Sequence, residues 1–134
     1  MDPVTVTHIT VKADRLHLTV QLAPDAPRAM TPELAACVVA AVPTLPHHAC
    51  VNDAGPALGA VLETTSVPHV LEHLIIDAQA HAALPATPAF VGTTSWRDEA
   101  AGLADIQVSY EDDIQALAAI NRALVTLNAI LQPQ

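Results

Sequence analysis

Apolar and polar residues alternate along two segments near the N-terminus, as they do in half-buried β-strands. Residues 4–11 (VTVTHITV) and 16–22 (LHLTVQL) show this period of two. A turn at Asp14 separates them, so an antiparallel hairpin is their natural pairing. Residues 86–96 and 105–110 are also expected to form strands.

Three other segments carry the start signals and the apolar spacing of α-helices. A threonine–proline pair opens residues 31–42, and a serine followed by a proline opens residues 66–83. Residues 112–131 begin with acidic side chains, which are favourable at the positive end of a helix dipole. Residues 43–56, with three prolines and a glycine, are expected to be irregular. The last helix should bury one broad stripe: Ile114, Leu117, Ala118, Leu124, Leu127 and Leu131.

The order strand, strand, helix, helix, strand, strand, helix indicates an α+β fold in two layers. We expect about four strands in a mostly antiparallel sheet, covered on one face by about three helices. A chain of 134 residues suits a single domain, residues 1–134, and its 51% hydrophobic content can fill a core. That core must be aliphatic, because the chain has only one Phe, one Trp and one Tyr.

The charge pattern argues against two classes of partner. The formal net charge is −9, and the five basic residues are scattered. Without a basic cluster, binding to nucleic acid or to an anionic membrane is not expected. No apolar run approaches the roughly 20 residues that span a bilayer, and the N-terminus lacks a signal-peptide pattern. We therefore expect a cytoplasmic protein, and its aliphatic composition allows a homodimer.

One motif points to chemistry: His69-Val-Leu-Glu72-His73, in the second predicted helix. Residues i and i+4 project from the same face of a helix, so the two imidazoles could bind one metal ion. Glu72 could reach a metal-bound water without being a ligand, which is the arrangement of the inverted zincin motif H-x-x-E-H. In the alternative interpretation, His69 and His73 are solvated residues at the edge of an apolar stripe.

A catalytic zinc ion has three protein ligands and one open position, so another segment must supply the third ligand. Glu111 is the first candidate, because it lies between a predicted strand and a predicted helix. Equally, Glu111 could be an acidic residue at the start of the helix that interacts favourably with the helix dipole. His48, in the irregular segment, is the second candidate, and Asp105 and Asp113 are weaker ones. Asp77, one turn beyond the motif, could orient an imidazole as an outer partner.

The remaining histidines and the cysteines are given smaller roles. His8, His17 and His81 are expected on the surface without a function. Cys37 lies in an apolar run and is expected in the core. Cys50 follows a pair of histidines and could suggest a thiolate site, but the spacing matches no zinc-ribbon pattern.

Four short segments occur in a distinctive order along the chain. They are Leu45–Cys50 (LPHHAC), Pro68–His73 with the H-x-x-E-H motif, Val91–Ser95, and Tyr110–Asp113 at the start of the last helix. Together they resemble the N-terminal domain of cyanophycin synthetases. The resemblance covers about residues 43–131, and the shared order makes it more specific than H-x-x-E-H alone.

In that family the domain sits beside ATP-grasp and Mur-ligase-like modules that build a polymer of aspartate and arginine. In some members it resembles a metallopeptidase that cleaves the polymer. The resemblance implies that His69 and His73 are metal ligands, Glu72 is the general base and Glu111 is the third ligand. The family's arginine-bearing turn is GTTSW here, so both arginines are lost. We therefore expect a substrate other than that polymer.

Two hypotheses of function follow. In the first, the chain is a zinc-dependent hydrolase of a peptide or isopeptide bond. In the alternative, it is a non-catalytic interaction or substrate-binding domain that partners a separate Mur-ligase-like or ATP-grasp enzyme. In both cases we expect a free-standing domain without the ligase modules. Zinc is the preferred ion, although manganese, nickel or iron could fit the same ligands.

Overall fold

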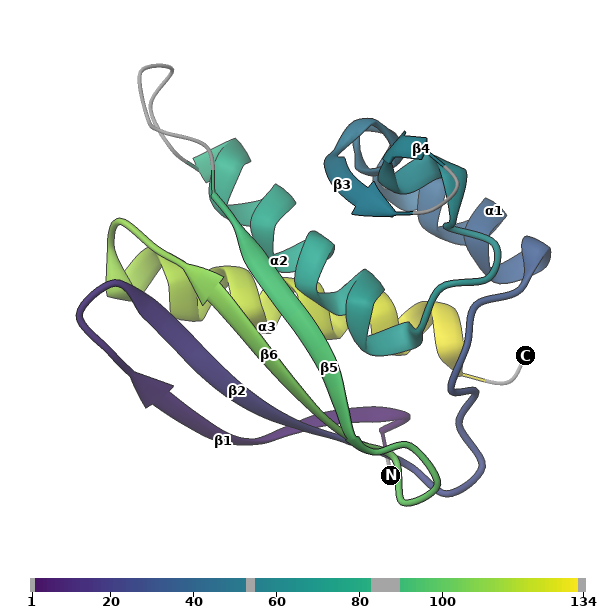
Figure 1. Cartoon of the computed structure of the whole chain (residues 1–134), viewed down its shortest axis with the longest axis horizontal. Coiled ribbons are helices and arrows are strands. Elements are labelled where there is room, and N and C mark those ends of the chain that lie inside the picture. The colour runs from purple at the N-terminus through teal and green to yellow at the C-terminus, as the bar shows by residue number, and fades with distance from the viewer. Residues whose placement is uncertain (1, 53–54, 83–89, 133–134) are drawn as a thin grey trace.

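The computed structural model describes residues 2–52, 55–82 and 90–132 (Figure 1). Its main sheet is antiparallel, with four strands in the order β1-β2-β6-β5, and helices cover one face of it. The predicted α+β class is therefore confirmed. The strands are β1 (Val4–Val11), β2 (Arg15–Leu22), β5 (Gly92–Asp98) and β6 (Leu103–Ser109), and the helices are α1 (Pro32–Ala41), α2 (Val67–Ala82) and α3 (Asp113–Leu131).

The central strands β2 and β6 alternate between a buried and an open face. Leu16, Leu18 and Val20 of β2 are fully buried beneath the helices, and so is Ile106 of β6. The residues between them carry the polar side chains of the open face. The predicted hairpin is also present, because β1 pairs with β2 in an antiparallel register. The period of two that was read from the sequence thus sets which face of the sheet forms the core.

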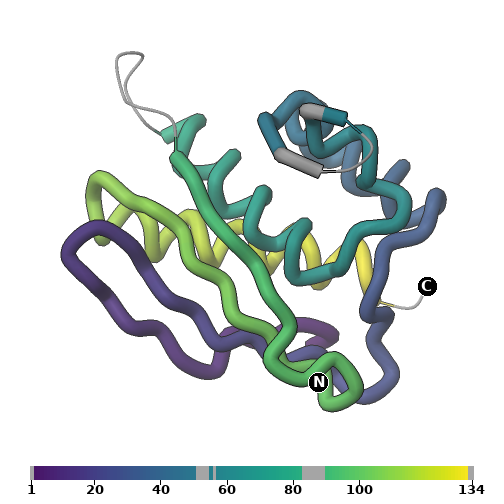
Figure 2. The backbone as a smooth tube through the Cα atoms, viewed as in Figure 1, coloured from purple at the N-terminus to yellow at the C-terminus, as the bar shows by residue number. Residues whose placement is uncertain are grey.

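Residues 43–52 and 55–60 form a segment between α1 and α2, which we call the small lobe. An irregular chain was predicted for residues 43–56, and this was wrong in part. The lobe contains two short 3₁₀ helices and a two-stranded ribbon, and the bounds are η1 (Leu45–His47), β3 (Ala49–Asn52), β4 (Gly55–Ala57) and η2 (Leu58–Ala60). Leu45 and Leu58 are fully buried and join the lobe to the core. Figure 2 follows the chain from α1 through the lobe into α2, and η1 contacts α2 directly.

The buried stripe predicted for α3 was correct at its end and wrong at its start. Leu127 and Leu131 are buried, but Ile114 and Leu117 are 75% and 43% exposed. The stripe that packs inward is instead rich in alanine over its first half, which lets α3 approach α2 closely. Its members are Ala116, Ala119, Ile120, Ala123, Leu127, Asn128 and Leu131. By length and composition alone α3 could cross a membrane, a test that core helices of soluble proteins also pass.

Two boundaries and one burial prediction also differ. The strand predicted over residues 86–96 appears as β5, which continues to Asp98, while residues 86–89 lie outside the described part of the chain. Strand β6 likewise begins at Leu103, two residues before the predicted strand, and Gly102 supplies the tight turn of the β5–β6 hairpin with a φ of 77°. Cys37, predicted in the core, is exposed on α1, whose buried residues are Ala35 and Val38.

Candidate metal centre

A row of polar side chains runs along the face of α2 that is turned toward the small lobe. His69, His73, Asp77 and His81 follow one another at four-residue spacing, so they lie on one side of the helix. His73 is only 4% exposed, and Glu72 beside it is 3% exposed. The interpretation of solvated edge residues therefore does not describe His73. Buried polar groups are costly unless they are paired, so the contacts of this row decide its meaning.

Three potential ligands converge where α2 faces β3. The Sγ atom of Cys50 and one ring nitrogen each of His69 and His73 lie within 4.8 Å of one another. Cys50 Sγ is 3.6 Å from His69 Nε2. In a tetrahedral zinc site, with Zn–S near 2.3 Å and Zn–N near 2.0–2.1 Å, a sulfur and a nitrogen ligand are about 3.5 Å apart. The donor set and this spacing therefore fit a zinc ion.

A chain of hydrogen bonds fixes the orientation of the His73 ring. His48 Nε2 lies 2.9 Å from Asp77 Oδ1, and His48 Nδ1 lies 3.1 Å from His73 Nδ1. Because the carboxylate accepts, His48 Nε2–H donates to Asp77, and His48 Nδ1 accepts from His73 Nδ1–H. Thr44 Oγ1 donates to the same Asp77 oxygen at 2.7 Å. His73 Nε2 is left without a proton, which is the form that binds a metal ion.

The second histidine is oriented in a similar way from the start of α2. Thr65 Oγ1 lies 2.8 Å from His69 Nδ1. This contact occupies Nδ1 and leaves Nε2 facing Cys50. Both imidazoles therefore present Nε2 to the cluster, and an outer hydrogen bond fixes each ring.

Glu72 lies beside the cluster and packs against β5. Its Oε1 accepts a hydrogen bond of 2.6 Å from Thr94 Oγ1, and its Oε2 lies 3.7 Å from His73 Nε2. A Cβ on Gly92 would come within 3.0 Å of Glu72 Oε2 and within 2.8 Å of the backbone oxygen of Gln107. Only glycine leaves room for the carboxylate here, so Gly92 and Thr94 together determine its position.

Burial shifts the pKa values of these groups in opposite directions. Burial and the neighbouring charges of His69 and His48 lower the pKa of His73 to about 3. Burial also lowers the pKa of His69. Burial raises the pKa of Glu72, and the hydrogen bond from Thr94 opposes that rise. Both histidines are therefore neutral at pH 7, as metal ligands must be.

The predicted third ligand, Glu111, is not brought to these histidines. It is exposed after the end of β6. Ser109, two residues earlier, accepts a hydrogen bond from Gln79 Nε2. Gln79 lies six residues beyond His73, which is about 9 Å along a helix. Glu111 thus lies near the far half of α2, and Cys50 provides the third group of the cluster.

The other predicted residues are spread over the molecule. Asp113 is exposed at the start of α3, and His8 is exposed on β1. Asp105 is on the open face of the sheet, where its carboxylate lies 3.0 Å from His17 Nε2 and accepts a hydrogen bond from Arg97. The hydrogen bond from Arg97 is the main reason why the pKa of Asp105 is lowered. These residues are remote from the cluster in the fold.

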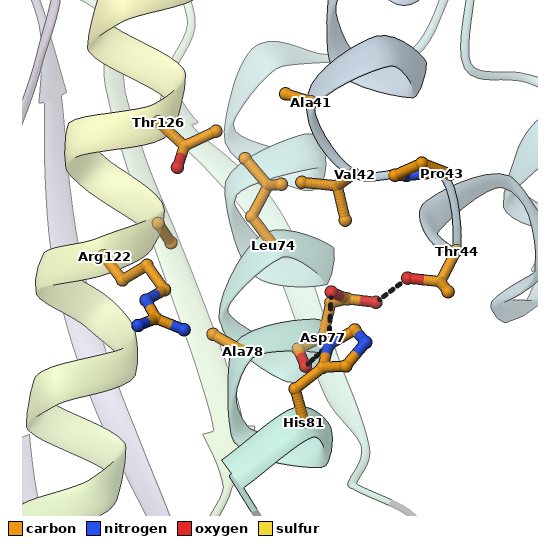
Figure 3. Close-up of a pocket in the computed structure, with 11 residues that line it drawn as sticks. Ala41, Val42, Pro43, Thr44, Leu74, Asp77, Ala78, His81, Arg122 and Thr126 are labelled. Atoms are coloured by element: carbon orange, nitrogen blue, oxygen red, sulfur yellow. Dashed lines mark hydrogen bonds and ion pairs between the residues drawn. The ribbon is translucent and has the colours of Figure 1, made fainter.

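A pocket of about 390 Å³ lies on the other side of Asp77, between the end of α1, α2 and α3 (Figure 3). His81 lines this pocket, and its Nδ1 is 2.9 Å from Asp77 Oδ2. Thr44 lines it as well, and Arg122 of α3 faces it from the opposite wall. Asp77 therefore separates the pocket from the cluster, with His48 and Thr44 bound on one carboxylate oxygen and His81 on the other.

Sequence reasoning gave too little weight to Cys50 and did not consider Thr94 or Gly92. A signal for Cys50 was present, because it follows His48 by two residues, and alternate residues of a short extended segment point the same way. Gly92 and Thr94 lie in Val91–Ser95, one of the four segments of the family resemblance, but no local pattern gives Thr94 a role among the several threonines in strands. Its role depends on the register of β5 beneath α2.

The fold and these contacts define an α+β domain with a partly buried thiol–imidazole cluster between helix α2 and the small lobe. A family model, the cyanophycin synthase-like N-terminal domain, matches residues 15–132. Because the match spans most of the chain, the chain belongs to this family, and the resemblance predicted from four short segments is confirmed. No curated protein gives a significant match. The family match concerns the domain and does not by itself assign a metal or a reaction.

Proposed function

We propose that this domain is a zinc-dependent hydrolase of peptide or isopeptide bonds. The observation that carries the proposal is the convergence of Cys50, His69 and His73, with the carboxylate of Glu72 beside them. Cys50 takes the place that the sequence had given to Glu111. Three protein ligands leave one position open, as in catalytic zinc sites. A thiolate with two imidazoles favours zinc over magnesium or manganese.

The chain's own residues would divide the reaction between them. A bound zinc ion lowers the pKa of a coordinated water to about 7 and polarises a carbonyl group. Glu72 accepts the water's proton as the new bond to the carbonyl carbon forms, and gives it to the leaving amine nitrogen as the old C–N bond breaks. The raised pKa of Glu72 suits this exchange near neutral pH. Thr94 holds Oε1, so Oε2, which lies 3.7 Å from His73 Nε2, is the oxygen that would accept the proton.

Metal analysis of the protein purified without a histidine tag tests the proposal. We expect about one zinc ion per chain, and loss of that zinc in His69→Ala and Cys50→Ser. Glu111→Gln and Cys37→Ser are matched controls, because both residues are exposed and lie outside the cluster. A protein that binds no divalent ion, or whose zinc survives His69→Ala, would contradict the proposal.

One observation favours the second candidate, a non-catalytic domain that docks onto a ligase. Exposed apolar residues gather on α3, where Ile114 is 75% and Val125 is 64% exposed. Such residues can form a contact with another protein or a second copy of the chain. Sedimentation of Ile114→Glu/Val125→Glu against the unaltered chain tests this. An assembly that depends on these residues and is indifferent to Glu72→Gln would favour the second candidate.

A further inference from the structure

Strand β5 is an edge of the sheet, and the hydrogen-bond pattern shows which of its backbone groups face outward. In the part of the chain that the structure describes, β5 pairs with β6 alone. Ser109 N–H donates to the Val91 carbonyl and Val91 N–H donates to Ser109 Oγ, so both backbone groups of Val91 face β6 and the two residues occupy a hydrogen-bonded pair position. Such pairs alternate in an antiparallel ladder. The N–H and C=O groups of Gly92, Thr94 and Trp96 therefore point away from β6.

The first half of the opposite edge, from Val4 to His8 of β1, is covered or irregular. The amide of Asn128 on α3 bonds both backbone groups of Val4, accepting from its N–H at 2.8 Å and donating to its carbonyl at 3.0 Å. The register of β1 also shifts between Val6 and His8. Covered backbone groups and bulges are two ways in which proteins protect sheet edges. From Gly92 to Trp96, β5 keeps a regular register.

The same part of β5 also contacts Glu72, the proposed general base. The side chain of Thr94 holds Glu72, and Gly92 lies directly beneath its carboxylate. A strand added outside β5 would therefore run beside Glu72 and the thiol–imidazole cluster. Main-chain pairing with an exposed edge is a general way of holding an extended peptide.

Charge narrows the class of peptide. The chain carries a net charge of −9, and β5 ends in Asp98, which Glu99 follows in the turn. Arg97, the basic residue of this strand, is already paired with Asp105 on the open face. An extended segment with basic side chains is thus the complementary occupant of this edge.

We propose that the edge of β5 from Gly92 to Trp96 receives an extended, basic peptide segment as a fifth strand and aligns its backbone with Glu72. This rests on the proposed function for its chemistry, but the binding step can be measured without it. Edge pairing places a backbone carbonyl rather than a particular side chain at the cluster. Specificity then comes from charge along the segment.

Amide hydrogen exchange tests this binding mode on the full-length, zinc-loaded Glu72→Gln chain, so that no peptide is consumed. The probe is an acetylated and amidated peptide of about eight alternating arginine and threonine residues, roughly 27 Å long when extended. When the peptide is bound, we expect the exchange rates of the Gly92, Thr94 and Trp96 amides to fall by about tenfold or more. Ile9 and Val11, on the β1 edge, should not change. Protection on β1 instead, binding without protection on β5, or no binding at millimolar peptide would overturn the proposal.

A pair of charge variants adds a second test. Glu99→Lys, beside the proposed edge, should weaken binding of this peptide about threefold or more. Glu33→Lys on α1 changes the net charge by the same amount and should weaken peptide binding less than Glu99→Lys does. Equal effects would contradict a site at β5. If the peptide protects β5 but the unaltered chain hydrolyses nothing, the binding mode stands and the proposed function fails. If the unaltered chain hydrolyses the peptide but β5 is not protected, the proposed function stands and the binding mode fails.

Discussion

The molecule contains two histidine–carboxylate contacts of nearly equal length in different surroundings. His48 lies 2.9 Å from Asp77 beside α2, and His17 lies 3.0 Å from Asp105 on the open face of the sheet. The first pair has side chains that are 16% and 9% exposed, and the second has 29% and 22%. Distance alone does not distinguish them. What differs is the group that each pair contacts next.

The contact of His17 and Asp105 leads to Arg97 and to solvent. This cation stabilises the charged carboxylate and lowers its pKa, as in many surface ion pairs of small energetic effect. The contact of His48 and Asp77 leads instead to His73, whose pKa burial lowers to about 3, and beyond it to Cys50. A fold gains little stability from burying such groups, so the buried arrangement is the better candidate for a function.

The largest expected effect separates chemistry from metal binding within the buried region. Glu72→Gln should lower the turnover of a peptide substrate by about 10²- to 10⁴-fold while zinc content stays the same, because a general base is lost and no ligand is. Mass spectrometry of the products of a basic peptide provides the rate. Thr94→Val keeps the carboxylate and should have a smaller effect. An active Glu72→Gln variant would remove this residue from the mechanism.

The next effect concerns the third ligand. Cys50→Ala should lower zinc affinity by about 100-fold or more, because even outer partners of metal ligands contribute 10- to 100-fold. Competition with a chromophoric chelator measures it. Cys37→Ala removes an exposed thiol on α1 and is the matched control. If Glu111→Gln weakened zinc binding and Cys50→Ala did not, the ligand set predicted from the sequence would be restored.

The sequence was sufficient to predict the elements that surround this site, because the relevant patterns are local. Strand periodicity in β2 and helix spacing in α2 are properties of neighbouring residues, so the sheet, its covered face and the shared side of His69 and His73 could be read directly. The distance from Cys50 to these histidines could not be read in this way, although its spacing from His48 was a signal. Cys50 meets the histidines only because the small lobe folds back over α2, and the burial of Leu45 and Leu58 fixes that return. Glu111 was chosen from its position between two elements, which gives no distance to α2.

The family resemblance worked differently from the physical pattern. Four ordered segments were sufficient to predict the family, and a match over residues 15–132 confirms it. The same resemblance implied Glu111 as a ligand, and the structure places that side chain away from the cluster. The order of motifs therefore established membership, whereas the convergence of side chains required coordinates.

A smaller effect is the dependence of stability on pH. The unfolded histidines titrate near pH 6.5, whereas the folded pKa values of His69 and His73 are lower. Below pH 6.5 the unfolded chain binds more protons, so stability is lost as the pH falls. Glu72 acts in the opposite direction, because its raised pKa favours the protonated folded state as pH falls. The large shift is that of His73, whose pKa falls to about 3, so the metal-free protein should lose about 2 kcal/mol of stability between about pH 7 and about pH 5.

Urea unfolding in the presence of a chelator measures this loss. His73→Gln should flatten the pH dependence, because the group with the lowered pKa is gone. His17→Gln, on the open face, should leave it in place. A stability that rises toward acid pH would show that Glu72 dominates and that the histidines are less desolvated than the structure indicates.

The smallest expected effect is at the exposed pair. His17→Ala should change the free energy of unfolding by less than about 1 kcal/mol at pH 7, because an imidazole in partial contact with water contributes little to a pair whose carboxylate keeps Arg97. The zinc affinity of His17→Ala should equal that of the unaltered chain.

His48→Ala, in the buried pair, removes the partner of both Asp77 and His73, so zinc affinity should fall about 10- to 100-fold. The comparison fails if the two alanine variants have equal effects on zinc, because burial would then have no part in what separates these contacts.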